Sequence, residues 1–384
     1  MSNQEHIYCI HDKTYNIADF VGKHPGGTNA FANLRSHTDI TPLIYSYHKD
    51  PSIIFEVLSK YEIKQHEPIQ YVTNYNYEKY VELKKLVYNE IGEKGYPLYW
   101  STFETAYNIG GFAIYIWVWI YCAMQPAVSA WWFLLLSVIN IGHCALIFHE
   151  TSHHVGFMNQ KLNTVVSYIA VSPIITTEEW KWEHNYLHHC FTNSHYDNDF
   201  TGHLLTFRNS SEHPYHFQHQ FQHIYAFLLF CVGGFSGQID SIKHKRWNIA
   251  LFALILYWFG VFNALVFYLS GGFMFLFIAQ LSHIQPECVK GPSNDFLVNQ
   301  VTCSMNYKTE NPIVRFICFG LDIQIEHHLF PNIPHSTLRQ VQHVVRDYCV
   351  KNGISYIEKQ DIVEMIQSYW CHLYEMGKRP RINI

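Results

Sequence analysis

An apolar region between residues 102 and 148 restricts how this 384-residue chain can fold, because it contains no lysine or arginine and one acidic residue, Glu104. Residues 105–124 and 130–148 each approach the length of about 20 residues that a helix needs to cross a hydrocarbon core. Only residues 125–129 separate them. We therefore predict a helical hairpin in a membrane.

Three histidine-rich segments stand out. They are residues 149–154 (HETSHH), 184–189 (HNYLHH) and 324–328 (QIEHH). On a helical turn, imidazoles three to five positions apart can point toward one region of space. The chain has 26 histidines, as many as its lysines and arginines together. This surplus, gathered in three segments, indicates a metal centre.

The number of imidazoles favours two metal ions. Neutral imidazole binds iron, copper, nickel or zinc, and these segments offer more nitrogen atoms than one ion can use. His149 and His283 stand at the ends of apolar segments, where histidine is costly and tends to be functional. In the first segment, the adjacent His153 and His154 leave open which of them is the second ligand.

The three segments can meet only if they lie on one side of the membrane. Residues 249–270 and 271–282 are predicted to form a second hairpin that turns at Gly271-Gly272. Residues 224–237 are assigned to the membrane surface, because a crossing there would place the third segment on the opposite side. The basic run of residues 243–246 puts its loop in the cytosol. We therefore predict four spans and a cytosolic histidine cap.

Charge and cysteine content exclude several classes of protein. The formal net charge is −5 and no basic stripe occurs, so a nucleic-acid partner has no electrostatic support. The ten cysteines are spread singly without a Cys-x-x-Cys pair, which argues against a disulfide framework or zinc knuckle. No secretory signal peptide is visible at the start, so the chain ends are expected in the cytosol.

The first 72 residues are predicted to form a small soluble α+β module. Short alternating segments indicate strands, and His24-Pro25-Gly26-Gly27 indicates a tight turn where the backbone can approach a flat ligand. His48 follows 24 residues after His24. The module resembles a cytochrome b5 domain, and the resemblance implies that His24 and His48 hold a haem b as axial ligands. His37 is a weaker candidate for the second ligand.

Essentially the whole chain resembles the membrane fatty-acid desaturases, and the third segment, with Gln324 in place of a leading histidine, is similar to that of the cytochrome b5-fused front-end enzymes. The resemblance implies a centre of two non-haem iron ions, with Gln324 lining it. Its implied ligands are His149, His153, His184, His188, His189, His283, His327 and His328. His195, Asp197 and Asp199 are expected to support the ligand imidazoles.

This resemblance implies three parts: a haem domain at 1–72, a linker at 73–101 and a desaturase domain at 102–384. It also implies O₂-dependent desaturation of an acyl-lipid or acyl-CoA, with electrons from an NADH-dependent cytochrome b5 reductase, in the endoplasmic reticulum membrane. A sphingolipid long-chain-base desaturase and a lipid hydroxylase are alternative enzymes. A membrane haem electron carrier with structural zinc is the alternative that is not an enzyme.

Overall fold

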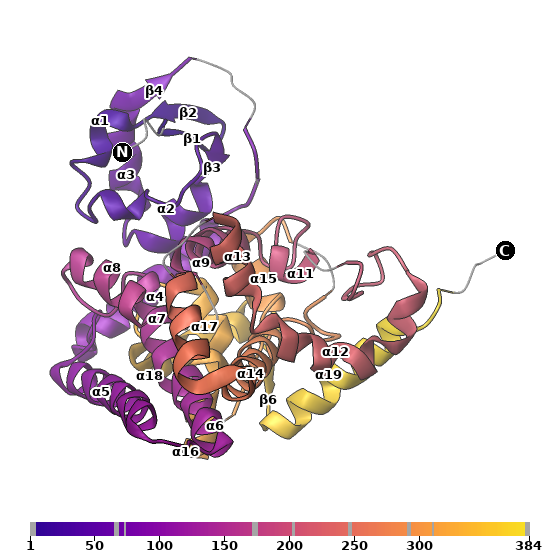
Figure 1. The fold of residues 1–384 in the computed structure, drawn as a ribbon. Coiled ribbons are helices and arrows are strands. Elements are labelled where there is room, and N and C mark those ends of the chain that lie inside the picture. The colour runs from indigo at the N-terminus through magenta and orange to yellow at the C-terminus, as the bar shows by residue number, and fades with distance from the viewer. Residues whose placement is uncertain are drawn as a thin grey trace.

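The computed structural model describes residues 5–64, 69–72, 74–170, 176–201, 204–244, 248–289, 293–308 and 311–380. Helices dominate this part of the chain, and a small sheet lies near the N-terminal end (Figure 1). The predicted mostly helical fold is confirmed, with the sheet where the α+β module was expected.

Residues 5–64, called the N-terminal unit below, fold around a four-stranded sheet in the order β3-β1-β2-β4. Its core includes Tyr8 and Tyr15, which face each other across the antiparallel pair β1 and β2. Asp50 accepts a hydrogen bond from the Ser52 amide at the start of α3. The elements are β1 (Ile7–Ile10), β2 (Lys13–Asn16), α1 (Ala18–Val21), β3 (Thr38–Asp39), α2 (Thr41–Tyr47), α3 (Pro51–Leu58) and β4 (Glu62–Ile63).

Helix α4 (Glu78–Lys94) connects the N-terminal unit to the membrane-type helices. It buries Tyr80, Leu83 and Val87, which share a core with α18 (His335–Lys351). The helix ends at Gly95, whose φ of 69° is left-handed, as is common after a helix.

The first apolar hairpin forms as predicted. Ser101 and Glu104 cap each other at the start of α5 (Thr102–Met124), so the one acidic residue of the apolar region accepts a hydrogen bond from the Ser101 amide. Its partner is one continuous helix made of α6 (Ala130–Ile139), the π-helical turn η3 (Asn140–Cys144) and α7 (Ala145–Ser152). On α5, Ile109 and Trp117 expose 62% and 59% of their surfaces, which suits contact with lipid.

Three helical segments in the described residues are long and apolar enough to cross a membrane: Thr102–Met124, Ala130–Ser152 and Ile249–Leu281, the last of which is divided at Gly260. A fourth results if the pair Phe217–Gly233 and Ser236–His244, bent by 46°, counts as one span. The number of four spans and the surface position of residues 224–237 therefore remain predictions. Lys245 and Arg246 of the basic run lie outside the described residues.

The predicted turn at Gly271-Gly272 is wrong, because α14 (Asn248–Leu281) reverses at Gly260. There φ is 75° and ψ is 168°, a conformation essentially restricted to glycine. The rings of Phe252 and Tyr268 lie 5.3 Å apart, whereas sixteen residues of straight helix would separate them by about 24 Å. Gly272 serves helix packing instead, since a Cβ there would lie 2.3 Å from the Gly234 nitrogen.

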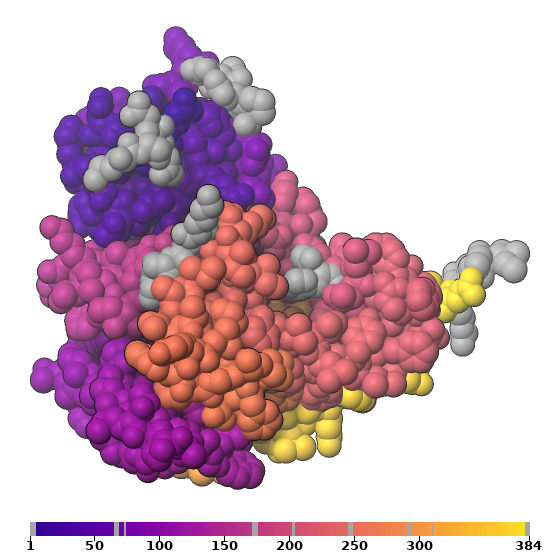
Figure 2. Space-filling view, in the orientation of Figure 1, coloured from indigo at the N-terminus to yellow at the C-terminus, as the bar shows by residue number. Residues whose placement is uncertain are grey.

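The N-terminal unit rests on the helical remainder, and α14 forms part of the visible outer surface (Figure 2). Helices α12 (Gln222–Gly233) and α19 (Ile362–Gly377) lie side by side away from α5 (Figure 1). The other elements are α8 (Gln160–Ile169), α9 (Thr177–Trp182), η4 (Glu183–His188), α10 (His189–Phe191), α11 (Asn198–Thr201), α13 (Ser236–His244), α15 (Phe296–Thr302), β5 (Asn306–Tyr307), α16 (Pro312–Ile317), α17 (Gln324–Leu329) and β6 (Glu358–Lys359).

Candidate metal centre

The second histidine segment forms the π-helical turn η4, and this local geometry explains its spacing. In a π-helix the hydrogen bonds run from residue i to residue i+5. The residues at i+4 and i+5 therefore both lie near the helix face of residue i. His184, His188 and His189 are all buried, and they divide between two groups of neighbouring imidazoles. The segment thus supplies ligand atoms to both.

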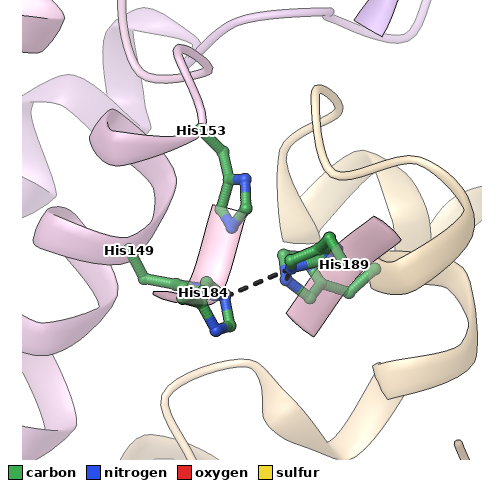
Figure 3. A group of neighbouring side chains, drawn as sticks. His149, His153, His184 and His189 are labelled. Carbon is green, nitrogen blue, oxygen red and sulfur yellow. Dashed lines mark hydrogen bonds between the residues drawn. The ribbon is translucent and has the colours of Figure 1, made fainter. Parts of the chain in front are cut away.

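The first group gathers five buried histidines from three segments (Figure 3 shows four of them). Their candidate ligand atoms all lie within 4.8 Å of one another. The Nε2 atom of His184 lies 2.9 Å from that of His149 and 3.2 Å from that of His189. The members of this group are His149, His153, His184, His189 and His327.

The second group consists of His188, His283 and His328. In each, Nδ1 lies within 3.1 Å of an oxygen that can only accept a hydrogen bond. Nδ1 must therefore carry the hydrogen, and Nε2 keeps its lone pair. The accepting oxygens belong to the Asp197 carboxylate, the Cys303 carbonyl and the Gln300 side-chain amide.

This arrangement fits bound metal ions. Metal-binding histidines generally donate their other ring N–H to a carboxylate or carbonyl, as the second group does. Within the described residues, Nε2 of His153 and Nε2 of His328 are buried without a hydrogen-bond partner. A metal ion satisfies such atoms. Stacking of His189 on His328, with ring centres 4.4 Å apart, joins the groups, so two ions would be neighbours.

Burial keeps most of these imidazoles in the metal-binding form. It lowers the pKa of His184, His189 and His327 well below the usual value, because a charged ring would lose its hydration. His188 is different. Burial also opposes its charge, but the nearby Asp197 carboxylate outweighs this effect and raises its pKa.

A small cavity of about 80 Å³ touches both groups. His149 and His184 border it from the first group, and His188 and His283 from the second. Gln324 also lines it, and its side-chain nitrogen lies 3.0 Å from Nε2 of His283. The remaining wall is mainly apolar and includes Phe275, Leu276, Phe319 and Leu321. An apolar group in this cavity would lie beside both sets of imidazoles.

The eight histidines named by the resemblance all enter the two groups, whereas His154 enters neither. The φ of His154 is 66°, so the backbone turns directly after His153. Asp197 and Asp199 lie 3.1 and 3.6 Å from Nδ1 of His188. His195 is exposed and contacts Tyr196 instead.

His335, at the start of α18, was missed by sequence reasoning. Its Nδ1 lies 2.9 Å from a Glu150 oxygen, and its ring stacks on His327 at 5.0 Å. Its Nε2 is buried without a hydrogen-bond partner in the described part of the chain. Gly320 permits this approach, because a Cβ there would lie 2.5 Å from the His335 ring. The signal in the sequence was its position shortly after the third segment.

A separate cavity of about 560 Å³, called the N-terminal cavity below, lies between the N-terminal unit and the helical remainder, since Tyr99, His154 and Lys181 also line it. His24 and His48 line it, and their ring centres are 6.0 Å apart at an interplanar angle of 83°. Nδ1 of His48 donates to the Ile44 carbonyl, so its Nε2 keeps a lone pair. Nδ1 of His24 lies 3.2 Å from the Gly26 amide nitrogen, and the ring also makes a hydrogen bond with the Gly27 backbone. His37 is outside the cavity wall.

Comparison with known proteins decides the family. The sequence profile described as fatty acid desaturase matches residues 126–360, which contain every histidine of the two groups. The chain belongs to the fatty acid desaturase family. Membership implies an oxidoreductase that acts on lipid, and the buried imidazoles are consistent with a metal site in such an enzyme.

Its relatives within the fatty acid desaturase family are distant but cover most of the chain. Acyl-lipid (8-3)-desaturase B of Dictyostelium discoideum is 24% identical and covers 97% of this chain and 91% of its own length. Delta(8)-fatty-acid desaturase 2 of Arabidopsis thaliana is 23% identical, covering 90% and 84%. The sn-1 linoleoyl-lipid 6-desaturase of Synechocystis is 25% identical over 68% of this chain and 84% of its own.

Proposed function

We propose that this protein introduces a double bond into the acyl chain of a lipid in an O₂-dependent reaction. The observation that carries the proposal is the pair of imidazole groups, each with its candidate ligand nitrogens within 4.8 Å of one another, beside a largely apolar cavity. A side-chain base cannot take a proton from an unactivated methylene at neutral pH. Two iron ions held by these groups would supply the oxygen chemistry that removes hydrogen from two adjacent methylenes.

The residues of the chain position the reactants. The cavity wall around Phe275 and Phe319 would hold a short section of the acyl chain beside both imidazole groups and exclude water from it. One O₂, two electrons and two protons, together with the two hydrogens of the acyl chain, give the double bond and two waters. We assign the eight histidines as metal ligands and Gln324 as a residue that lines the site.

We further propose that the enzyme is a front-end desaturase with its own haem domain. The cavity between His24 and His48 would hold a haem b, which passes on electrons from an NADH-dependent cytochrome b5 reductase. The proposed boundaries are 1–72, 73–101 and 102–384. The haem domain and the metal centre would face the cytosol from the endoplasmic reticulum membrane. Three relatives whose names include acyl-lipid, Delta(8) or linoleoyl-lipid support a lipid-linked or fatty-acid substrate.

Expression in a host without polyunsaturated lipids, with candidate acyl chains supplied, tests this function. A new double bond lowers the product mass by two hydrogens, whereas a hydroxylase adds one oxygen. Zinc in place of two non-haem irons per chain would support the electron carrier. Mapping the double bond would separate a front-end desaturase from other types.

Variants connect the reaction to its residues. His328→Ala should abolish product without altering the haem spectrum, and His48→Ala should remove that spectrum. His343→Ala is the control, because His343 is half exposed and outside both imidazole groups. Full activity in His328→Ala would contradict the assignment of the metal centre.

A further inference from the structure

The junction between the N-terminal unit and the metal centre contains a direct contact. The Tyr47 hydroxyl at the end of α2 lies 2.6 Å from Nδ1 of His153, a member of the first imidazole group. The next residue is His48, whose ring faces His24 across the N-terminal cavity. One peptide bond therefore joins a candidate haem ligand to a residue that contacts a candidate iron ligand.

On the side of the metal centre, the adjacent residues His153 and His154 also contact different sites. His153 belongs to the first imidazole group, while His154 lines the N-terminal cavity. The left-handed backbone at His154, with φ of 66°, sends these two side chains to different sites. Each of two dipeptides, Tyr47-His48 and His153-His154, thus touches both sites, and Tyr47 itself borders the cavity while its hydroxyl contacts His153.

Backbone contacts hold the Tyr47-His48 segment in place. The buried Lys84 ammonium of α4 donates to the carbonyls of Tyr45 and His48. The side-chain amide of Asn332 donates to the Tyr47 carbonyl at 3.2 Å. Donors from two separate parts of the chain therefore fix the position from which the Tyr47 hydroxyl reaches His153.

We propose that the Tyr47 hydroxyl bridges the haem domain and the metal centre and carries the electrons between them. This inference rests on the proposed function. With Nε2 of His153 directed to the metal, Nδ1 carries the hydrogen and donates it to the Tyr47 oxygen. The route runs from the His48 ring through the backbone to Tyr47 and across one hydrogen bond to His153.

The electron balance is simple. In each passage the haem loses one electron and the metal centre gains one, and two passages serve each double bond. The external reductase restores both electrons to the haem. Tyr47 is a positioning residue in this scheme and is neither oxidised nor reduced overall. Phenylalanine keeps the ring but removes the only atom of Tyr47 that makes the hydrogen bond with His153.

The full-length protein with haem and iron allows a direct test in Tyr47→Phe. Haem reduced by NADH and reductase without oxygen is mixed with O₂ and substrate, and its reoxidation is followed by absorbance. His328→Ala supplies the background rate. We expect substrate-dependent reoxidation to slow at least about tenfold, with haem and iron contents unchanged. Tyr45→Phe is the matched control, because Tyr45 is on the same helix and its hydroxyl contacts His11.

A second arm separates electron transfer from the orientation of His153. Both centres are reduced chemically, the reductant is removed, and one turnover is started with O₂ and substrate. We expect the same product per chain in Tyr47→Phe and in the unaltered protein. A wild-type rate in the first arm, or an equal loss in both arms, overturns the proposal. Failure of the unaltered protein to form product would count against the proposed function instead.

Discussion

Neighbouring residues can serve different sites when the backbone reverses between them. His153 is buried among other imidazoles, whereas His154 lines the N-terminal cavity. Few L-residues adopt positive φ, and histidine is among those enriched there. The two rings therefore belong to different chemical environments although they are adjacent in sequence.

Single substitutions should separate the roles of these two histidines. His153→Ala removes a candidate ligand, so we expect iron affinity to fall by at least the roughly 10- to 100-fold that loss of a ligand's hydrogen-bond partner costs. His154→Ala should keep the iron content of the unaltered protein. Elemental analysis of purified variants measures both effects. Equal iron loss in the two variants would contradict the division seen in the structure.

At the scale of residues, spacing indicated a metal centre, and the family resemblance supplied the individual ligands. Helical periodicity identifies which histidines share a side, and all eight ligands implied by the family resemblance enter the two imidazole groups. The choice between His153 and His154 could not be predicted, because it depends on one backbone angle. The contacts of Tyr47 with His153 and of His335 with Glu150 join residues that are distant in sequence, so no local pattern reveals these two contacts.

At the scale of elements, α14 shows how one glycine lets the chain reverse between two helical arms. Residues near its reversal are apolar and exposed: Tyr257, Trp258, Val261 and Phe262 expose 82%, 60%, 66% and 71% of their surfaces. Gly260 supplies the backbone conformation that this reversal needs. The tip of the hairpin is therefore fixed by a residue that other amino acids cannot replace without strain.

We expect Gly260→Ala to destabilise the protein by about 1–3 kcal/mol, because the conformation is essentially restricted to glycine. Thermal unfolding in detergent would show a lower midpoint temperature. Gly110→Ala is the matched control, since Gly110 is inside helix α5 with open space around its Cα. Its midpoint should stay the same or rise. Identical midpoints in both variants would refute the strain at Gly260.

The error about Gly271-Gly272 has a physical origin. Glycine favours turns because it lacks a Cβ, and it favours close helix contacts for the same reason. Composition cannot distinguish these uses. The structure assigns the turn to Gly260 and the contact with Gly234 to Gly272. The first hairpin was easier to predict, because five residues including Pro126 separate its two apolar segments.

For the molecule as a whole, the main question is how firmly the N-terminal unit is attached. Lys84 contacts two carbonyls at the end of α2, and the Tyr186 hydroxyl donates to the Asp39 carbonyl at 2.8 Å. These bonds join segments that are far apart in sequence. The sequence indicated a haem-type module and a connector, but it could not place the module over the metal centre.

Lys84→Met should loosen this attachment. Loss of the ammonium leaves two carbonyls without their donor, which costs about 1–3 kcal/mol for each buried group. Because 1.4 kcal/mol is a tenfold change in an equilibrium, amides of residues 45–48 should exchange hydrogen at least about tenfold faster. Mass spectrometry measures this exchange. Lys85→Met, which changes an exposed neighbour, should leave the rate unaltered, and equal protection in both variants would exclude a role for Lys84.

The early reversal of α14 also affects the surroundings of the protein. Its first arm, residues 248–259, extends only about 18 Å at the usual helical rise. An average hydrocarbon layer is about 30 Å thick. The bilayer next to this arm would have to become thinner, which costs fractions of a kcal/mol per ångström of mismatch. The uneven depth of the two hairpins would thus favour thin bilayers over thick, sterol-rich ones.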